Sequence, residues 1–114
     1  MTNEADFDEI LYMTPGHVTP GVKRDALKAR LDLVPWQSLE SVAHVLAHGA
    51  QKYGVDNWQR VENAEQRYFA AALRHLIAWQ SGEKLDPESG KPHLAHAACC
   101  VLFMLWFEVQ KNAK

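Results

Sequence analysis

The residues best suited to chemistry lie close together in the segment "DPESGKPHLAH", which spans residues 86–96 of this 114-residue chain. It contains two carboxylates, Asp86 and Glu88, and two histidines, His93 and His96, three positions apart. Side chains at that spacing share one face of a helix. Carboxylate oxygen and imidazole nitrogen both bind metals, and imidazole also titrates near neutral pH. The segment therefore predicts a mixed oxygen and nitrogen metal site, with histidine available as a general base.

Two other interpretations of this segment stay open. Asp86 and Ser89 could instead cap the helix that follows and brace the turn before it. Alternatively, His93, His96 and Cys100 fall on one side of that helix and could bind zinc. The sequence has no paired CxxC spacing, however, and Cys100 lies deep in an apolar stretch. A closed structural zinc site is therefore the less favoured interpretation.

Three helices are predicted to position these residues. Apolar residues recur at helical spacing after Ser38, a candidate N-cap, as far as Gly54. The same periodicity predicts helices over roughly 64–81 and 92–111, and no period-two alternation indicates a strand. The predicted fold is all-α, a helical bundle of three main helices plus a short irregular N-terminal segment. We expect a single domain, 1–114, with an irregular segment over 1–35 and a helical core over 36–111.

Composition excludes several classes of protein. Apolar residues make up 47% and charged residues 23%, as in globular proteins, and the net charge of −2 gives no general attraction to nucleic acid. The adjacent Cys99 and Cys100 are poorly placed for a disulfide, which indicates a reducing compartment. The acidic N-terminus does not resemble a secretory signal, and the run "AACCVLFMLWF" is too short to span a bilayer. We expect a cytoplasmic protein with neither a nucleic-acid nor a membrane partner.

The same apolar run predicts self-association. It makes the middle of the third helix hydrophobic on every face, and two other helices cannot cover all of it. Exposed apolar patches of that size usually mark an interface. We therefore expect a homo-oligomer, either a dimer or a tetramer, whose interface completes the bundle.

The first two helices carry further polar side chains at helical spacing. Glu40, His44 and His48 share one stripe of the first helix, which is either a solvated face or the wall of a cleft. Arg74 lies on a stripe of small residues of the second helix, where a ligand could approach closely. His75 lies at the edge of the apolar face, either as a boundary residue or as a ligand contact.

Two blocks of sequence, "GAQKYGVDNW" and "RHLIAWQSGEKLDPESGKPHLAHA", resemble the phage dATP/dGTP diphosphohydrolase N-terminal family. The resemblance runs from about Lys28 to Phe107, and the family is associated with MazG-like all-α nucleotide pyrophosphohydrolases. It implies cleavage of a nucleoside triphosphate, most naturally a purine dNTP, to the monophosphate and pyrophosphate. It also implies a phage-encoded protein acting in the host cytoplasm, with Mg²⁺ or Mn²⁺ held by ExxE and ExxD carboxylates. The sequence departs from this pattern, because Glu40 has no acidic partner at position 43 and the third helix carries histidines.

The resemblance and the residue chemistry together define a candidate site. The expected catalytic residues are Glu40, Asp86 and His93, and the expected ligands of Mg²⁺ or Mn²⁺ are Glu40, Asp86, Glu88, His93 and His96. Since imidazole suits Mn²⁺ better than Mg²⁺, histidine ligands favour Mn²⁺. The expected contacts to the nucleoside triphosphate are Lys28, Arg30, Lys52, Asn57, Trp58, Arg74 and His75. Trp58 could stack on the base beside Asn57, or it could close the end of the bundle.

Two other functions stay open. The chain could bind a nucleotide or a nucleotide signal in the same pocket without hydrolysing it, because carboxylates of the family pattern are missing. It could also be a small helical protein-interaction module whose histidines are structural. Stabilisation by nucleotides and release of pyrophosphate would separate the three interpretations.

Overall fold

The computed structural model describes residues 19–113, and contacts within the chain divide it into two compact units, Met1–Val34 and Pro35–Lys114. The described part of the first unit contains a single short 3₁₀ helix, η1 (Leu31–Leu33), next to an Arg30–Asp32 ion pair of 2.7 Å. The N-terminal residues that were expected to carry no secretory signal lie outside the described residues. The expectation of a single domain stays a prediction.

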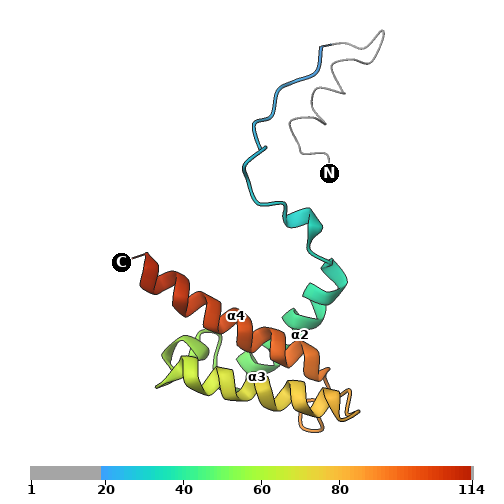
Figure 1. The fold of residues 1–114 in the computed structure, drawn as a ribbon, viewed down its shortest axis with the longest axis vertical. Coiled ribbons are helices and arrows are strands. Elements are labelled where there is room, and N and C mark those ends of the chain that lie inside the picture. The colour runs from blue at the N-terminus through green and yellow to red at the C-terminus, as the bar shows by residue number, and fades with distance from the viewer. Residues whose placement is uncertain (1–18, 114) are drawn as a thin grey trace. The chain divides into compact units, whose positions relative to one another are not determined.

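The second unit confirms the all-α prediction. It consists of α2 (Trp36–Tyr53), η2 (Asn57–Arg60), α3 (Ala64–Gln80) and α4 (His93–Asn112). Among residues 19–113 the only β feature is an isolated antiparallel bridge between Leu85 and Pro92, in the loop that connects α3 to α4. Figure 1 shows α3 and α4 side by side and running in opposite directions, and α4 also packs against α2.

The helix ends follow the sequence except at the start of α2. This helix begins at Trp36, so the prediction that Ser38 caps it is wrong. Proline is well suited to a helix start because its φ is fixed and its missing N–H would have no partner there. Accordingly, the Pro35 carbonyl accepts the Leu39 N–H at 3.0 Å. The predicted stop at Gly54 is confirmed, since this residue has a φ of 98° and directly follows Tyr53.

The core of this unit is built from small side chains. Val42 and Val45 of α2 form a buried cluster with Ala95 and Cys99 of α4. The Cys99 thiol also lies 3.5 Å from the Val42 carbonyl oxygen, to which it can donate. Because small residues at a helix contact let the axes approach closely, α2 is held against the first half of α4. This contact fixes the distance across which residues of α2 face residues of α4 and its preceding loop.

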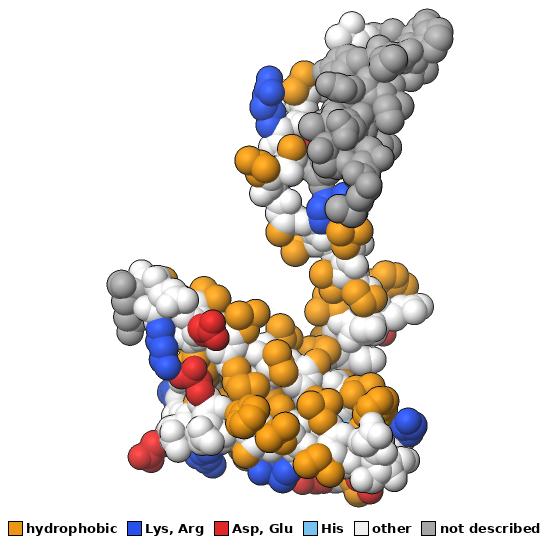
Figure 2. All heavy atoms as spheres, in the orientation of Figure 1, with side chains coloured by type: hydrophobic (Ala, Val, Ile, Leu, Met, Phe, Trp, Pro, Cys, Tyr) orange, Lys and Arg blue, Asp and Glu red, His pale blue; other side chains and the backbone are white. Residues whose placement is uncertain are grey.

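One face of α4 is not covered within the described part of the chain. Leucine and valine side chains on this helix are 45–53% exposed; they are Leu94, Val101, Leu102, Leu105 and Val109. Figure 2 shows hydrophobic side chains gathered along the position of α4. The uncovered face agrees with the sequence argument that two helices are too few to bury α4.

The length of α4 bears on the membrane expectation. Among residues 19–113, α4 is the one helix whose length and mean hydropathy of 1.3 would allow it to cross a bilayer. The expectation that the chain has no membrane partner rested on the apolar run alone, and it stays a prediction. Core helices of water-soluble proteins meet the same criterion, and α4 contributes five buried residues to this unit.

Candidate functional site

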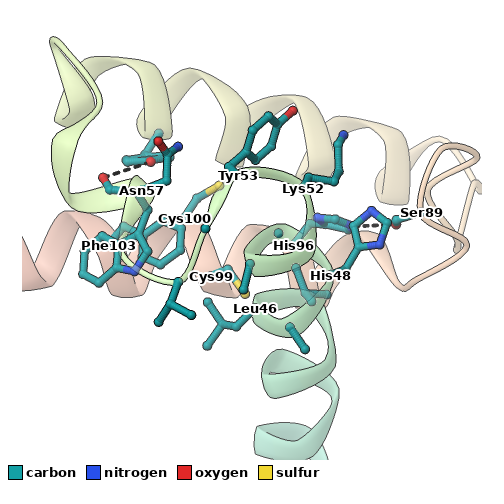
Figure 3. Close-up of a pocket in the computed structure, with 18 of the residues that line it drawn as sticks. Leu46, His48, Lys52, Tyr53, Asn57, Ser89, His96, Cys99, Cys100 and Phe103 are labelled. Carbon is teal, nitrogen blue, oxygen red and sulfur yellow. Dashed lines mark hydrogen bonds between the residues drawn. The ribbon is translucent and has the colours of Figure 1, made fainter.

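A cavity of about 690 Å³ lies where α2, η2, α3 and α4 meet the loop over residues 81–92. Figure 3 shows His48, His96 and Ser89 at one end of this cavity, and Asn57 and Phe103 at the other. We call the first the polar end; its lining residues are His48, Lys52, His75, Asp86, Glu88, Ser89 and His96. We call the second the aromatic end; its lining residues are Asn57, Trp58, Tyr68 and Phe103. The cavity thus joins a titratable surface to an aromatic one.

Three histidines from two helices meet at the polar end. His75 Nδ1 of α3 lies 2.8 Å from His93 Nδ1 of α4, so one proton can be shared between the two nitrogens. The His75 ring also stacks face to face on the His96 ring, with centroids 4.5 Å apart and planes 10° apart. Burial lowers the pKa of His75, and the neighbouring His96 and His93 lower it further. His75 is therefore neutral near pH 7.

A carboxylate fixes the tautomer of the buried His93. This side chain is 4% exposed, and its Nε2 lies 2.6 Å from Glu83 Oε1. An ionised carboxylate only accepts hydrogen bonds, so the proton must be on Nε2 of His93. In the neutral ring, Nδ1 then carries a lone pair that points at His75. Sequence reasoning missed Glu83, although Glu83 and Asp86 have the ExxD spacing that the resemblance implied.

Asp86 is held by the turn that it organises. Its Oδ2 accepts the Ser89 N–H at 2.9 Å, and its carbonyl accepts the Gly90 N–H at 2.7 Å. Burial alone would raise the pKa of Asp86, but the hydrogen bonds from Ser89 and the nearby His96 and His75 lower it overall. Asp86 therefore stays ionised and braces the turn, as one sequence interpretation held. It does not cap α4, because the N-cap position is Pro92.

His96 completes the polar end. Its Nε2 lies 2.7 Å from Ser89 Oγ and 3.8 Å from Asp86 Oδ2. Burial lowers the pKa of His96, Asp86 partly opposes this, and His93 and His48 add to the lowering. The polar end thus combines the ionised Asp86 with the neutral rings of His75 and His96, which is the protonation state that metal binding requires.

The start of α4 offers few unpaired N–H groups. Such groups at the beginning of a helix can bind a phosphate. In the structure the His93 N–H donates to the Lys84 carbonyl at 2.9 Å. The Ala95 and His96 N–H groups donate to the Pro92 carbonyl at 3.1 and 3.2 Å. Because these three groups already have acceptors, they are not available to a phosphate.

An exposed ion pair lies beside the polar end. Lys52 Nζ of α2 lies 2.6 Å from Glu88 Oε1 of the loop. The hydrogen bond with Glu88 raises the pKa of Lys52 and lowers that of Glu88. Exposed ion pairs of this kind contribute little to stability and exchange partners readily. Lys52 therefore adds a positive charge to the lining of the cavity.

The aromatic end is packed by its own side chains. Trp58 stacks on Phe103 with centroids 4.4 Å apart and planes 11° apart, and it meets Trp106 edge-on at 4.9 Å. The Tyr68 hydroxyl donates to the Trp58 carbonyl at 3.1 Å. These contacts fit the interpretation of Trp58 as a residue that closes the end of the bundle. One face of its ring is already occupied, although the side chain still lines the cavity.

Other expected site residues lie away from the cavity. The side chain of Glu40 is 63% exposed, pairs with His44 at 3.8 Å, and is not among the residues that line the cavity. Arg74 is also exposed and does not line it. Lys28 and Arg30 belong to the Met1–Val34 unit, and their role stays a prediction.

One group of side chains could hold a metal ion. His75, Asp86 and His93 each present a ligand atom, and these three atoms all lie within 4.8 Å of one another. Asp86 and His93 were expected as metal ligands, whereas His75 was expected to contact the substrate. His96 lies next to the group, while Glu88 is paired with Lys52. The donor set therefore fits a divalent cation, with fewer carboxylates than expected.

Comparison with known proteins connects this geometry to a family. Residues 18–114 match the family described as dATP/dGTP diphosphohydrolase, N-terminal. A dATP/dGTP diphosphohydrolase of Salmonella phage PMBT28 is 41% identical over 86 residues, which are 75% of this chain and 29% of that protein. The chain thus spans less than a third of the relative's length. No solved structure matches the chain.

Proposed function

Because the chain belongs to the dATP/dGTP diphosphohydrolase N-terminal family, as its motifs predicted, we propose that it hydrolyses a purine deoxynucleoside triphosphate to the monophosphate and pyrophosphate. The observation that carries the proposal is the cavity, which has histidines and Asp86 at one end and aromatic rings at the other. A nucleotide has the same polarity, with a charged phosphate chain at one end and a flat base at the other. The volume of the cavity, about 690 Å³, also lies in the usual range for small-molecule sites, about 300–1,000 Å³.

The base is proposed to lie at the aromatic end. Asn57 and Trp58 line this end, and an amide side chain can both donate and accept hydrogen bonds at a purine edge. Because Phe103 covers one face of Trp58, only the other face and the ring edge remain for the base. Shape and the Asn57 amide would therefore contribute more to recognition than stacking between two rings.

The phosphates are proposed to lie at the polar end, where they require a cation. A triphosphate carries about four negative charges, and Asp86 and Glu88 add two more. Lys52 alone cannot balance these charges. We propose a divalent cation, Mg²⁺ or Mn²⁺, held by His75, Asp86 and His93, which when bound would neutralise phosphate charge and activate water. Asp86 supplies the negative charge for this cation because its turn keeps it ionised.

His96 is the proposed general base. His93 was expected in this role, but it is buried and both of its ring nitrogens have partners. His96 lines the cavity, and its Nε2 can accept the Ser89 hydroxyl proton in the hydrogen bond of 2.7 Å. Its lowered pKa keeps this nitrogen unprotonated at neutral pH, so that it can take a proton from water directly or through the Ser89 hydroxyl.

We propose that a second copy of the chain packs against the exposed apolar face of α4. The exposed leucine and valine side chains form one apolar face along this helix, and a homodimer or homotetramer would bury it. We propose that the active protein is such an oligomer. A monomer in light scattering at micromolar concentration would contradict this part of the proposal.

Product analysis tests the proposed function. The purified chain is incubated with dATP, dGTP and the other nucleoside triphosphates in Mg²⁺ or Mn²⁺, and pyrophosphate is measured. We expect pyrophosphate from purine dNTPs, a loss of about 100-fold or more in Asp86→Asn, and no change in Glu65→Gln, whose carboxylate pairs with Lys111. Thermal stabilisation by dATP or dGTP without pyrophosphate would instead indicate a binding protein. If nucleotides neither stabilise the chain nor are hydrolysed by it, the remaining interpretation is a protein-interaction module.

A further inference from the structure

We propose that His75, His93 and Asp86 form a transition-metal site that prefers Mn²⁺ to Mg²⁺, and that Glu83 is its positioning residue. The use of this ion in hydrolysis rests on the proposed function. Binding of the ion does not, so it can be tested without any nucleotide.

The separation of the two nitrogens suits a metal ion. His75 Nδ1 and His93 Nδ1 are 2.8 Å apart. Neighbouring ligands of an octahedral ion with bonds of about 2.1 Å lie about 3 Å apart. The spacing therefore matches two adjacent ligands, and an ion would bind beside the line that joins the two nitrogens, once each ring turns so that its lone pair points at the ion.

Glu83 holds the buried ring in the orientation that such a site needs. Histidines that bind metals usually donate their other N–H to a carboxylate, which fixes the tautomer and makes the ring a better ligand. The hydrogen bond of 2.6 Å between His93 Nε2 and Glu83 Oε1 has this arrangement. Backbone contacts hold Glu83 in place, because the His93 N–H donates to the Lys84 carbonyl and Leu85 bridges to Pro92.

Asp86 completes the site and connects it to the cavity. Its carboxylate supplies one oxygen ligand and the negative charge that two neutral imidazoles lack. His75 and Asp86 both line the cavity, whereas His93 lies behind them. A bound ion would therefore face the phosphates and keep positions open for water. Two imidazoles and one carboxylate suit Mn²⁺ and its transition-metal neighbours, while Mg²⁺ prefers oxygen ligands throughout.

The same contact has a competing explanation. Without any ion, Glu83, His93 and His75 form a chain of hydrogen bonds that could pass a proton between the loop and the cavity. Metal binding distinguishes the two, because a proton relay has no reason to take up Mn²⁺.

Titration of the metal-free chain with Mn²⁺ tests the inference, with free Mn²⁺ followed by electron paramagnetic resonance. We expect one Mn²⁺ per chain and competition by Mg²⁺ at least about tenfold weaker. His75→Ala should remove binding, since a ligand is lost. Glu83→Gln should weaken it by about 10- to 100-fold, as losses of such partners do. The matched controls are His44→Ala and Glu65→Gln, which remove an exposed histidine and an exposed carboxylate and should bind like the parent.

Three results would overturn the inference: no Mn²⁺ bound at millimolar concentration, equal binding of Mn²⁺ and Mg²⁺, or unchanged binding in His75→Ala. His75 is substituted instead of His93 because His75 is only half-buried, so its loss should disturb the fold less. Circular dichroism checks that each variant is folded. Mn²⁺ binding without pyrophosphate release would refute the proposed function alone. Full hydrolysis by His75→Ala would refute the metal site alone.

Discussion

The two ends of the cavity are built on different physical principles. At the polar end, ring nitrogens and oxygens have specific partners, as in the contacts of Glu83 with His93 and of Ser89 with His96. At the aromatic end, Trp58 is held by the shapes of Phe103 and Trp106. Hydrogen-bonded groups respond to protonation and charge, whereas packed rings respond to volume. Substitutions at the polar end should therefore alter chemistry, and those at the aromatic end should alter stability.

The largest effect on stability is expected at the aromatic end. Trp58→Ala should lower the free energy of unfolding by about 3–5 kcal/mol, because it removes the ring that Phe103 and Trp106 pack against. Urea denaturation measures the loss, with Trp58→Phe as the control that keeps an aromatic ring. A loss below about 1 kcal/mol would mean that the ring is not structural and is free to contact a base.

At the polar end a substitution should lower activity much more than stability. Asp86→Asn should lower the free energy of unfolding by less than about 2 kcal/mol, because asparagine can still accept the Ser89 N–H. Pyrophosphate release should nevertheless fall by about 100-fold or more, since the charge that holds a cation is lost. Parallel denaturation and activity measurements test this. An equal loss of both would show that Asp86 only braces its turn.

A smaller effect is expected on the pH dependence of stability, which should come from the polar end and not from the aromatic end. His96 has a pKa below its usual 6.5 in the folded chain, because burial together with His93 and His48 outweighs the opposing Asp86 and Glu88. The unfolded chain therefore takes up this proton first as the pH falls. Stability should decline from about pH 6.5 down to the lowered folded-state pKa. Denaturation with a chelator present measures this decline, and His96→Gln should make it shallower. Trp58→Phe should leave the slope unchanged.

The smallest expected effect concerns the thiols between the two ends. Burial raises the pKa of Cys99 to about 12, and burial also raises the pKa of Cys100. Only the thiolate reacts with alkylating agents, so both thiols should be modified much more slowly in the folded chain than in urea. Mass spectrometry after iodoacetamide treatment follows the modification. Rapid labelling of the folded chain would show that the helix contact around Cys99 opens readily.

The sequence predicted the helices and the family more fully than the site. Periodicity is a local property, so α3, α4 and the end of α2 at Gly54 followed from it, and the Asp86 turn followed from residues three positions apart. The contact between His75 and His93 depends instead on how far two antiparallel helices slide along each other. Packing between the helices sets this register, and no local pattern reports it.

The missed and misplaced residues have the same explanation. The ExxD spacing of Glu83 and Asp86 was visible in the sequence but was overlooked because it lies in a loop and not on a helix. The contact of Glu83 with His93, ten positions away across a turn, was not visible. Glu40 and Arg74 lie near the edges of their helical faces, where a small rotation decides between cavity and solvent. In the structure both are exposed. Helix periodicity alone could not decide this.

We propose that the cavity of this chain cleaves a nucleoside triphosphate between its α- and β-phosphates. The most direct test incubates the chain with dGTP or dATP and Mn²⁺ in ¹⁸O-labelled water and identifies the products by mass spectrometry. The parent should give deoxynucleoside monophosphate and pyrophosphate, with the label in one of these two products, and Asp86→Asn should give almost none of either. Formation of the diphosphate and inorganic phosphate, or equal activity in Asp86→Asn, would contradict the proposed cleavage.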